Sequence, residues 1–436
     1  MAMRKALVLL PLVILAGLAA VAAWPKDEPR SLKLWVEKPK TVLALQWKRD
    51  APYLVRADAR TLRRQGRVAL PLSGHWLGSS FSPDGKLLAV GSDGFGDVWF
   101  VDTKRLRLVG TAQAEEYGSV IETAWAGGKL VAVVDRCCRD EATDGLTVTV
   151  IDAARRAPVS GHRLDGSVEA AARSASGLVL VLGPRGRVGT ARLVVADAEG
   201  GPESVALDRI AAGSEIREGH PIGRAATPGV AVDKAGNRAF VVGAGSPVAE
   251  VDLETLAVTY HDLATPVSLP GRLHDWLEPA AEAKAPPNGP QRFARWLGDG
   301  YVAVWGVDNQ SWVDPQRGEQ WRQTSVGIKL IDTHDWSVRT LDRQASGLAV
   351  ADRTLLTFGT LSDSALPKAA GIGLRAYLAD GTRRFHRFGA APLDAVYVVG
   401  SRAFVADRAG SYVVLDAQTG RAFRRVRGAM LEPLLR

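Results

Sequence analysis

Short apolar stretches, each bounded by Gly, Pro, Asn or Asp, recur along most of the chain. Thr227–Leu263 shows the pattern most clearly, with apolar segments at Val230–Val232, Phe240–Val242, Val248–Asp252 and Leu256–Leu263. β-branched residues between turn formers indicate strands rather than helices. This stretch therefore predicts a unit of four short antiparallel strands joined by tight turns.

The same pattern recurs eight times, and its most regular part is a third strand that ends in Asp. These Asp residues are Asp58, Asp102, Asp152, Asp197, Asp252, Asp332, Asp380 and Asp416. An Asp side chain at this position can cap the turn to the fourth strand. A four-stranded unit leaves an apolar face exposed and must stack on copies of itself, so the repeats predict an all-β fold, a β-propeller. Eight units favour eight blades over seven, although one unit could be shared between the chain ends or lost.

Individual repeats resemble those of known propeller families. Residues 227–242 (TPGVAVDKAGNRAFVV) resemble an NHL or YVTN-type repeat, and residues 81–94 (FSPDGKLLAVGSDG) resemble a tryptophan–aspartate (WD) repeat. Residues 415–426 (LDAQTGRAFRRV) are similar to the repeat of pyrroloquinoline-quinone enzymes and of bacterial propeller lipoproteins. The resemblance, to the quinoprotein amine dehydrogenase heavy chain-like superfamily, covers Leu32–Arg427 as architecture. It implies a binding scaffold or, in a minority of relatives, a redox enzyme.

The first 23 residues differ from the repeats and predict one hydrophobic helix before the propeller. Arg4 and Lys5 precede the apolar run Ala6–Ala23, which suits either a cleaved signal peptide or an uncleaved membrane anchor. The small residues of Ala20–Ala22 favour cleavage, and Trp24 suits a membrane interface. Both alternatives export the remaining chain to the periplasm or another extracytoplasmic space, with an inner-membrane anchor if the segment is retained.

The expected domain organisation follows from these segments. Residues 1–23 are the signal or anchor, residues 24–38 are a linker or a ring-closing strand, and residues 39–436 are the propeller. The formal charge of +8 is a mild excess spread along the chain. Its densest basic runs, residues 383–387 and 421–427, fall where outer strands are expected. Such charges are expected to be solvated or to guard strand edges, because an anionic partner would require a clustered stripe. No nucleic-acid partner is predicted.

The two cysteines are adjacent, at Cys137 and Cys138. In an oxidising compartment they would form a disulfide with each other, unless they pair between molecules. The pair would then be a rigid loop tip or, alternatively, a redox or binding site. The seven histidines have no metal-binding spacing. No metal, cofactor or catalytic residue is predicted.

The long connections fall into two classes. First-to-second and third-to-fourth turns are short, and in a propeller both emerge on one face, the short-turn face. Second-to-third turns and blade links emerge on the opposite face, the long-loop face. All long segments belong to that face: Arg136–Gly145, Arg209–Ala226, Ala264–Pro290, Gly306–Ser325 and Gly359–Gly371. Binding function usually resides in such loops, so the long-loop face is the expected site.

The candidate binding residues lie in and around two of these segments. They are Trp276, Trp305, Asp308, Trp312, Asp314, Arg317 and Trp321. Exposed Trp beside polar groups suits sugar or peptide binding, whereas the alternative is that these rings pack the loops onto the propeller. The sequence therefore predicts an exported, non-enzymatic propeller that binds a partner protein or a cell-envelope polymer through its long-loop face. Membrane contact would come through Ala6–Ala23 if that segment is uncleaved. The alternative function is a redox enzyme or enzyme subunit of the quinoprotein type.

Overall fold

The computed structural model describes residues 40–48, 51–71, 78–136, 145–199, 201–215, 223–245, 247–263, 288–361, 363, 370–407, 411–426 and 431–434. The chain divides into two units, Met1–Leu32 and Lys33–Arg436, and every described residue belongs to the second. These residues form strands and turns. In this part of the chain, no helix is long and apolar enough to cross a membrane. The predicted hydrophobic helix of residues 1–23 and the segment 24–38 lie outside the described residues.

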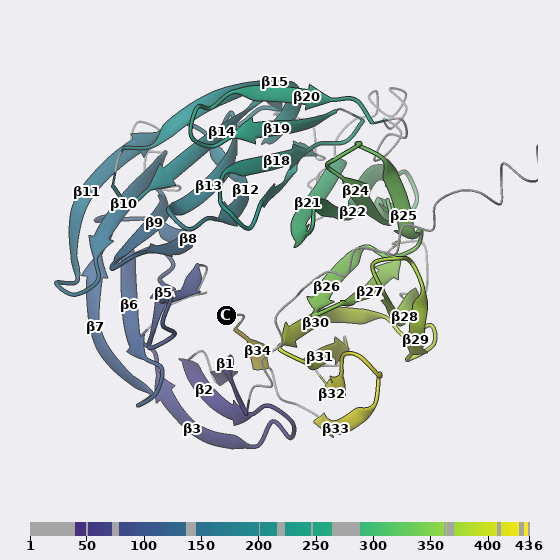
Figure 1. Ribbon diagram of the computed structural model, residues 1–436, viewed down its shortest axis with the longest axis horizontal. Helices are drawn as coiled ribbons and strands as arrows, with labels where there is room; N and C mark the ends of the chain where they lie inside the picture. Colours follow the sequence, from purple (N-terminus) through teal and green to yellow (C-terminus); the bar gives the residue numbers. More distant parts are fainter. Residues whose placement is uncertain are drawn as a thin grey trace, which may run out of the picture. The chain divides into compact units, whose positions relative to one another are not determined.

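The strands pair into eight antiparallel sheets, six of four strands and two of five, which we call blades 1 to 8 (Figure 1). Blade 1 contains β1 (Thr41–Lys48), β2 (Ala51–Asp58), β3 (Arg64–Ala69) and β34 (Leu431–Pro433). Blade 2 contains β4 (Ser79–Phe81), β5 (Leu87–Gly91), β6 (Asp97–Asp102) and β7 (Arg107–Gln113). Blade 3 contains β8 (Ser119–Ala126), β9 (Lys129–Asp135), β10 (Leu146–Asp152) and β11 (Ala157–Leu164).

Blades 4 and 6 are the two that carry an extra strand. Blade 4 contains β12 (Ser167–Arg173), β13 (Gly177–Gly183), β14 (Gly189–Asp197), β15 (Glu203–Glu215) and β16 (Arg224–Ala226). Blade 5 contains β17 (Gly229–Val232), β18 (Arg238–Val242), β19 (Val248–Asp252) and β20 (Val258–His261). Blade 6 contains β21 (Gly289–Gly298), β22 (Tyr301–Asp314), β23 (Gly318–Ser325), β24 (Ile328–Asp332) and β25 (Val338–Asp342).

The last two blades have four strands each. Blade 7 contains β26 (Gly347–Ala351), β27 (Thr354–Leu361), β28 (Ala370–Tyr377) and β29 (Arg383–Arg387). Blade 8 contains β30 (Leu393–Val399), β31 (Arg402–Asp407), β32 (Tyr412–Asp416) and β33 (Ala422–Val426). In Figure 1 the blades follow one another around a centre in chain order, from purple to yellow. This is the arrangement of an eight-bladed β-propeller, and the predicted four strands of Thr227–Leu263 are confirmed as blade 5.

The two ends of the described chain contribute strands to the same blade, blade 1. β34 forms its innermost strand by pairing with β1, so that Ala44 lies opposite Pro433 and Leu45 opposite Glu432. Leu434, just beyond the strand, is buried among apolar side chains that include Leu45 and Leu88. The alternative of a unit shared between the ends is therefore confirmed together with eight blades, because sharing completes blade 1 rather than removing it.

The turn after each third strand is the most regular local structure of the fold. At all eight predicted positions, Oδ1 of the Asp accepts a hydrogen bond from the backbone N–H two residues later, at 2.7–3.1 Å. The fourth residue after Asp58, Asp102, Asp152, Asp252 and Asp332 has a left-handed φ of 51–58° although it is not glycine. The predicted capping role of these carboxylates is confirmed.

The left-handed residue of this turn is directed to the preceding blade. Leu62 packs with apolar residues of blade 8, and Trp336 of blade 6 stacks on His261 of blade 5 and lies tilted against Phe240 of the same blade. Buried apolar side chains fill the junctions between blades in the same way, for example Phe100 of blade 2 against Leu130 of blade 3. Because each blade buries its faces against two neighbours, the core lies between the blades and not within one sheet.

Two of the predicted long loops consist mainly of strands in their described parts. Gly306–Ser325 is a hairpin that prolongs β22 and adds β23, and Arg209–Ala226 contains the end of β15 and all of β16. The prediction of loops was therefore wrong for these parts, because cross-strand pairing beyond the blade satisfies their backbone groups. Both segments lie at the predicted end of their blades. The Cys137–Cys138 loop, Ala264–Pro287 and residues 364–369 lie outside the described residues.

Candidate functional site

The hairpin of β22 and β23 is the most developed feature of the long-loop face. β22 pairs with β24 over Tyr301–Val304 and then continues as the partner of β23, from Val307 opposite Ser325 to Asp314 opposite Gly318. The turn of this hairpin is capped by an Asp side chain, as are the turns after the third strands of the blades. The carboxylate of Asp314 accepts hydrogen bonds from the backbone N–H groups of Gln316 and Arg317, both at 2.8 Å. These bonds lower the pKa of the Asp314 carboxyl, so the turn is closed by an ionised cap.

Strand register places the three tryptophans of this region on different faces. Directly opposite residues of an antiparallel pair share a face, and successive residues alternate. Trp312 lies opposite Gln320, whereas Trp321 lies opposite Ser311. Trp312 and Trp321 therefore point to opposite sides of the hairpin, and Trp305 shares the side of Trp321. The two sides of the hairpin therefore carry different candidate rings.

Each ring that the hairpin presents has a defined neighbour. Trp305 stacks on Phe293 of β21, with ring centroids 5.8 Å apart, and Phe293 is 41% exposed. The Arg322 guanidinium lies over Trp312 at 5.9 Å, and its Nε is 2.7 Å from a carboxylate oxygen of Asp363. Trp305 and Trp312 are both half-buried. The rings are thus positioned by packing and still retain surface for a ligand.

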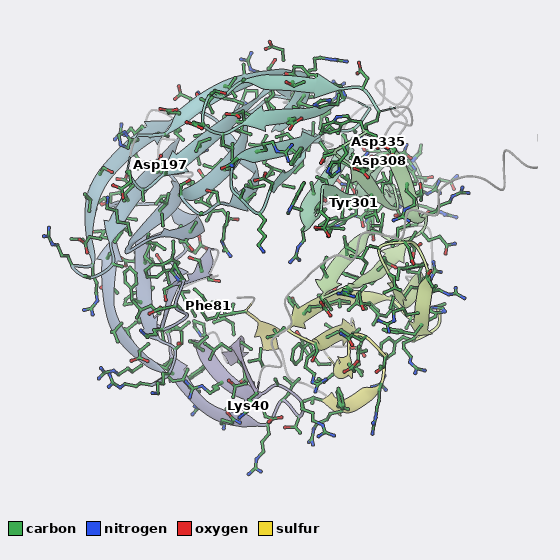
Figure 2. All side chains as sticks on the ribbon, in the orientation of Figure 1. Lys40, Phe81, Asp197, Tyr301, Asp308 and Asp335 are labelled. Carbon is green, nitrogen blue, oxygen red and sulfur yellow. The ribbon has the colours of Figure 1, made fainter. Side chains whose placement is uncertain are left out.

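Asp308 has a different environment from the other candidates. Its Oδ1 is 2.5 Å from Nη2 of Arg292, whose side chain is fully buried and also donates to the carbonyl of Val307 at 2.8 Å (Figure 2 labels Asp308). Lys329 is buried beside this pair. Burial lowers the pKa of the Lys329 amine, the charge of Arg292 lowers it further, and the charge of Asp308 opposes the change. Asp308 therefore compensates two buried cations below the hairpin.

A second strand pairing links the hairpin to blade 4. Residues 223–227 run parallel to residues 288–292, with backbone hydrogen bonds of 2.7–2.9 Å that include Ala225 N–H to Asn288 O and Arg292 N–H to Thr227 O. The Asn288 side chain then pairs with the backbone of Ser311 in β22. A side chain at Gly289 would collide with the carbonyl oxygen of Ala225, so this close approach requires glycine. We call residues 223–227, residues 288–292 and the β22–β23 hairpin the rim sheet.

A small cavity lies beside the rim sheet. It has a volume of about 250 Å³ and is lined by Arg209, Ala211, Ala226, Thr227, Pro228, Gly243, Ala244 and Pro290. These residues come from β15, from the link between blades 4 and 5, from a second-to-third turn and from β21. All of them belong to the long-loop end of their blades, and the space suits a side chain of a larger ligand. Another cavity, of about 320 Å³, lies on the outer side between blades 2 and 3, distant in the fold from the predicted residues.

Charged side chains on the innermost strands form a set that the sequence reasoning missed. Arg173 of blade 4 donates from Nε to the carbonyl of Thr123 at 3.0 Å and from Nη2 to the carbonyl of Ser79 at 2.5 Å, which joins three blades. Burial raises the pKa of Glu122 and lowers that of Arg173, and the charge of each opposes the shift of the other. Part of the Arg173 residue nevertheless remains exposed to solvent. Arg173 therefore combines hydrogen bonds to blades 2 and 3 with partial access to solvent.

Two further charges belong to the same inner strands. Burial raises the pKa of the Glu169 carboxyl, although it accepts a hydrogen bond from Ser167 at 2.7 Å, and burial lowers the pKa of Arg295. Glu169 is the extra residue where the pairing of β12 with β13 shifts. A sequence signal for this set exists in Ser167–Arg173, where Glu and Arg interrupt an otherwise small and apolar inner strand.

The motif that suggested a quinoprotein has a local structural explanation. The carboxylate of Asp416 accepts hydrogen bonds from the backbone N–H groups of Gln418 and Thr419 and from the Thr419 hydroxyl, and Gly420 has a φ of 67°. Asp252 and Thr255 form the same contacts in blade 5. Asp416–Gly420 is therefore one copy of the turn found around the ring. Within the described ranges, no three His, Cys, Asp or Glu side chains are grouped to hold a metal ion. Trp276, Cys137 and Cys138 lie outside these ranges.

Comparison with known proteins supports the fold and leaves the activity open. No family model matches the chain, and no curated protein matches it. Among solved structures, the chain is similar to the dihydro-heme d1 dehydrogenase NirN in complex with DHE, with a TM-score of 0.54 and 13% identity over 93% of this chain and 76% of that one. It also matches BamB from Moraxella catarrhalis, with a TM-score of 0.44 and 11% identity over 87% and 99% of the two chains. At 13% identity, the likeness to NirN shows the β-propeller fold alone.

Proposed function

We propose that this protein is an exported, non-enzymatic β-propeller that binds a partner protein or a cell-envelope polymer through its long-loop face. The observation that carries the proposal is the β22–β23 hairpin, which projects beyond blade 6 and presents half-buried Trp312 beside charged side chains. A ring with a held orientation loses little conformational freedom on binding, which favours affinity. Trp276, from the neighbouring long segment, is proposed to belong to the same surface.

Several contacts support a preorganised surface. Ser311 is held by Asn288, Arg322 by Asp363, and the Ser325 hydroxyl donates to the carbonyl of Ala345 at 2.6 Å. These contacts attach the hairpin to β21 and to blade 7. A projecting hairpin without such contacts would be marginally stable in water. The short-turn face differs, because its third-to-fourth turns are closed by the Asp caps within a few residues.

The location is proposed from the N-terminal segment. Arg4 and Lys5 before Ala6–Ala23 favour export of the repeats, with the segment cleaved as a signal or kept as an inner-membrane anchor. In that compartment, Cys137 and Cys138 are proposed to form a disulfide. Asp314 and Arg317 in the hairpin turn, and Trp305 and Trp321 on the side of the hairpin opposite Trp312, are proposed to complete the binding surface, while Asp308 maintains the charge balance beneath it.

Site-specific photo-crosslinking in the native cell tests the proposal. A photoreactive amino acid at exposed Gln316, in the hairpin turn, is expected to give a discrete product, whereas one at exposed Lys234, on the short-turn face, is expected to give none. Protease digestion of the product separates a protein partner from a polymer. Trp312→Ala should reduce the product at least about tenfold at unchanged melting temperature, as expected of a central aromatic contact. Trp312→Phe should retain most of it.

Other outcomes of the same experiments would contradict the proposal or assign Trp312 a different role. Equal products from both faces, or an unchanged yield with Trp312→Ala, would contradict binding through the long-loop face. A sharp fall in the melting temperature of Trp312→Ala would show that this ring serves to pack the hairpin.

A further inference from the structure

The outermost strands of three consecutive blades carry an unbalanced positive charge. β3, β29 and β33 contain Arg and His residues and neither Asp nor Glu. All seven of their arginines are exposed, and we call six of them, which make no hydrogen bond to a described residue of a neighbouring blade, the basic wall: Arg64, Arg67, Arg383, Arg384, Arg424 and Arg425. These are the basic runs 383–387 and 421–427 of the sequence, joined by a third strand from the other end of the chain.

Direct contacts make the basic wall continuous. Nε of Arg387 in β29 donates to the carbonyl of Gly420 in blade 8 at 3.1 Å, and Phe385 packs against Gly420. The Arg60 guanidinium, in the turn before β3, lies 5.1 Å from the centre of the Phe423 ring in β33. Closure of blade 1 by β34 thus places blade 1 beside blade 8, so the arginine-bearing strands β3 and β33 come from opposite ends of the chain and lie on neighbouring blades (Figure 1).

The charge of the basic wall is not neutralised locally. None of its six arginines forms an ion pair with another described residue, although many of the described arginines elsewhere do. The outer strand of blade 4 differs, because β15 contains Glu203, Asp208 and Glu215 together with one arginine, which pairs with Asp262. The outer strands of blades 7, 8 and 1 thus contain two or three arginines each, whereas β7, β11, β15 and β25 contain one each.

Protection of strand edges does not explain this distribution. An outer strand can be protected by a β-bulge or by charge. The pairing of β3, β29 and β33 with their neighbours is shifted by one residue, but the same shift occurs in β7, β11 and β25. All six edges have the bulge, yet β7 and β11 each contain only one arginine. The additional charge on the three strands therefore needs another reason.

We propose that the basic wall rests on an anionic membrane surface and binds phospholipid headgroups. Arginine is suited to this contact because its planar guanidinium binds phosphate in a bidentate manner. Basic segments held close to a bilayer are attracted to its negative surface. The inference takes from the proposed function only that the protein is exported to the outer side of the membrane, where an uncleaved Ala6–Ala23 would hold it.

The length of the chain before the propeller fits this arrangement. The described chain begins at Lys40, on blade 1 (Figure 2). Residues 24–40 separate this point from the apolar segment and can span at most roughly 60 Å. Blade 1 and its neighbour blade 8 are therefore within reach of the bilayer. Contact through the outer side leaves the long-loop face free, so both surfaces can be occupied together.

The test uses the full chain reconstituted in vesicles. An environment-sensitive fluorescent amino acid replaces exposed Ala422 in β33 or, as a control, exposed Ala206 in β15, and the vesicles carry a quencher on their headgroups. In phosphatidylglycerol–phosphatidylcholine vesicles, quenching is expected at position 422 and not at 206. It should be absent in pure phosphatidylcholine, and 0.5 M salt should remove it because charge interactions are screened.

Matched variants locate the contact. Arg383→Gln, Arg384→Gln, Arg424→Gln and Arg425→Gln together should reduce the phosphatidylglycerol-dependent quenching at least about tenfold. Arg155→Gln, Arg163→Gln, Arg187→Gln and Lys234→Gln together remove the same charge from blades 3 to 5 and should leave it unchanged. Equal loss in both sets would overturn the proposal, because net charge alone would then explain it. Equal quenching in both kinds of vesicle would overturn it as well.

Two further results complete the test. If inorganic polyphosphate binds the wild-type protein and vesicle quenching is absent, the basic wall recognises a soluble polyanion and the membrane proposal is wrong. Crosslinking from Gln316 is measured on the same quadruple variant and should be unchanged. If this variant loses quenching and keeps the crosslinked product, its substitutions have removed the membrane contact and left binding at the long-loop face intact, as expected. In the wild-type protein, quenching without a crosslinked product from Gln316 would contradict the long-loop proposal alone, and a crosslinked product without quenching would contradict the membrane proposal alone.

Discussion

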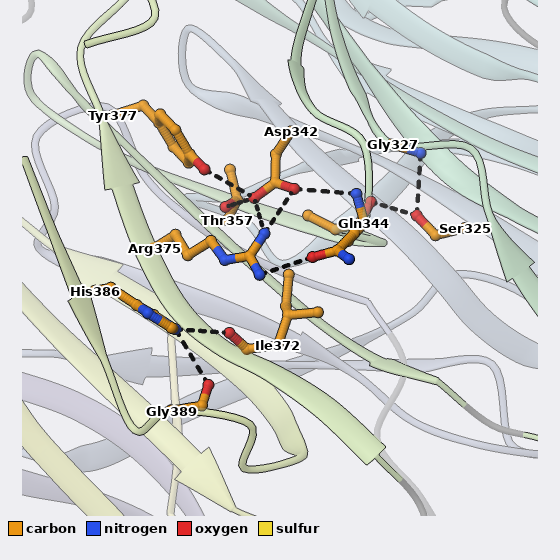
Figure 3. Close-up of polar contacts among 11 residues, drawn as sticks. Ser325, Gly327, Asp342, Gln344, Thr357, Ile372, Arg375, Tyr377, His386 and Gly389 are labelled. Atoms are coloured by element: carbon orange, nitrogen blue, oxygen red, sulfur yellow. Dashed lines mark hydrogen bonds and ion pairs between the residues drawn. The ribbon is translucent and has the colours of Figure 1, made fainter. Parts of the chain in front are cut away.

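The carboxylate of Asp342, at the end of blade 6, accepts hydrogen bonds from the guanidinium of Arg375 in blade 7, at 3.1 and 3.3 Å (Figure 3). The Thr357 hydroxyl and the Tyr377 hydroxyl also donate to it, at 2.8 and 3.3 Å. The side chain of Asp342 is 2% exposed. Two blades are thus joined by a buried ion pair whose charges are largely removed from water.

Removal of one partner of this pair should strongly destabilise the protein. Asp342→Ala leaves the Arg375 charge without its partner, and the free energy of unfolding should fall by about 3–5 kcal/mol. Denaturation in urea measures the change. Asp299→Asn, at an exposed position on blade 6, is the control and should change the free energy little. If Asp342→Ala unfolds at the wild-type urea concentration, the pair does not stabilise the junction.

Leu434 should be important for ring closure. Its side chain is 6% exposed and packs with Leu45 and Leu88. Leu434→Ala removes these contacts and should lower the free energy of unfolding by about 2–4 kcal/mol. Val159→Ala, at a side chain that is 59% exposed, should have almost no effect. Similar denaturation midpoints for the two variants would show that β34 contributes little to holding the ends together.

Two glycines in turns allow the energetic cost of backbone strain to be measured separately from the cost of steric crowding. Gly127 has a φ of 59° with open space around it, whereas a Cβ on Gly420, with a φ of 67°, would lie 2.8–3.0 Å from the Phe385 ring. Gly127→Ala should therefore cost only the left-handed backbone penalty, about 1–2 kcal/mol. Gly420→Ala should cost more, and Phe385→Leu in the same chain should recover part of the difference. Equal effects of the two glycine variants in thermal unfolding would contradict the docking of this turn on blade 7.

The capped turns should make the fold sensitive to acid. Backbone N–H groups of Arg105, Arg155 and Thr255, as the largest cause, lower the pKa of Asp102, Asp152 and Asp252. A carboxyl with a lower pKa in the folded state contributes stability above its unfolded pKa of about 3.9, and this is lost as the pH falls through the folded value. Replacing the three residues by Asn should lower the urea midpoint at pH 7 and reduce its fall between pH 5 and pH 3.

Asp97 is a control because its pKa is shifted in the opposite direction from those of the capping residues. Burial raises the pKa of its carboxyl, so its ionised form is disfavoured in the folded state, and its contribution to stability is lost as the pH rises. Asp97→Asn should therefore leave the midpoint at pH 7 unchanged or raise it. An acid response of the triple variant identical to that of the wild type would show that the caps do not set acid stability.

The sequence could predict the repeating parts of the fold because their signals are local. Asp252 caps its turn with atoms at most three residues away, and the continuous apolar run Ala239–Val242 reports burial directly. Trp312 and Trp321 illustrate what local signals omit. Both were expected at one site, but the face that each occupies depends on the pairing of Trp312 with Gln320 and of Ser311 with Trp321. A different turn length would have placed the rings together.

Other features depended on partners far away in the chain. Leu431–Pro433 contains a proline and has no strand pattern of its own, and its structure follows only from the free edge of β1. The basic wall combines Arg64 with Arg424, so its continuity could not be seen in either run. Arg292 looked like an ordinary charged residue of an inner strand, and its burial depends on Asp308 in the next strand.

The shared first blade also determines when the protein can finish folding. β1 is among the first strands to be made, yet the segment that covers its inner edge follows every other strand in the chain. A nascent chain therefore has to keep that edge unpaired while the other blades assemble, and contacts between such distant residues form slowly. During this interval the open edge can pair with another chain. A chaperone that shields β1 until the last residues arrive would prevent this misassembly.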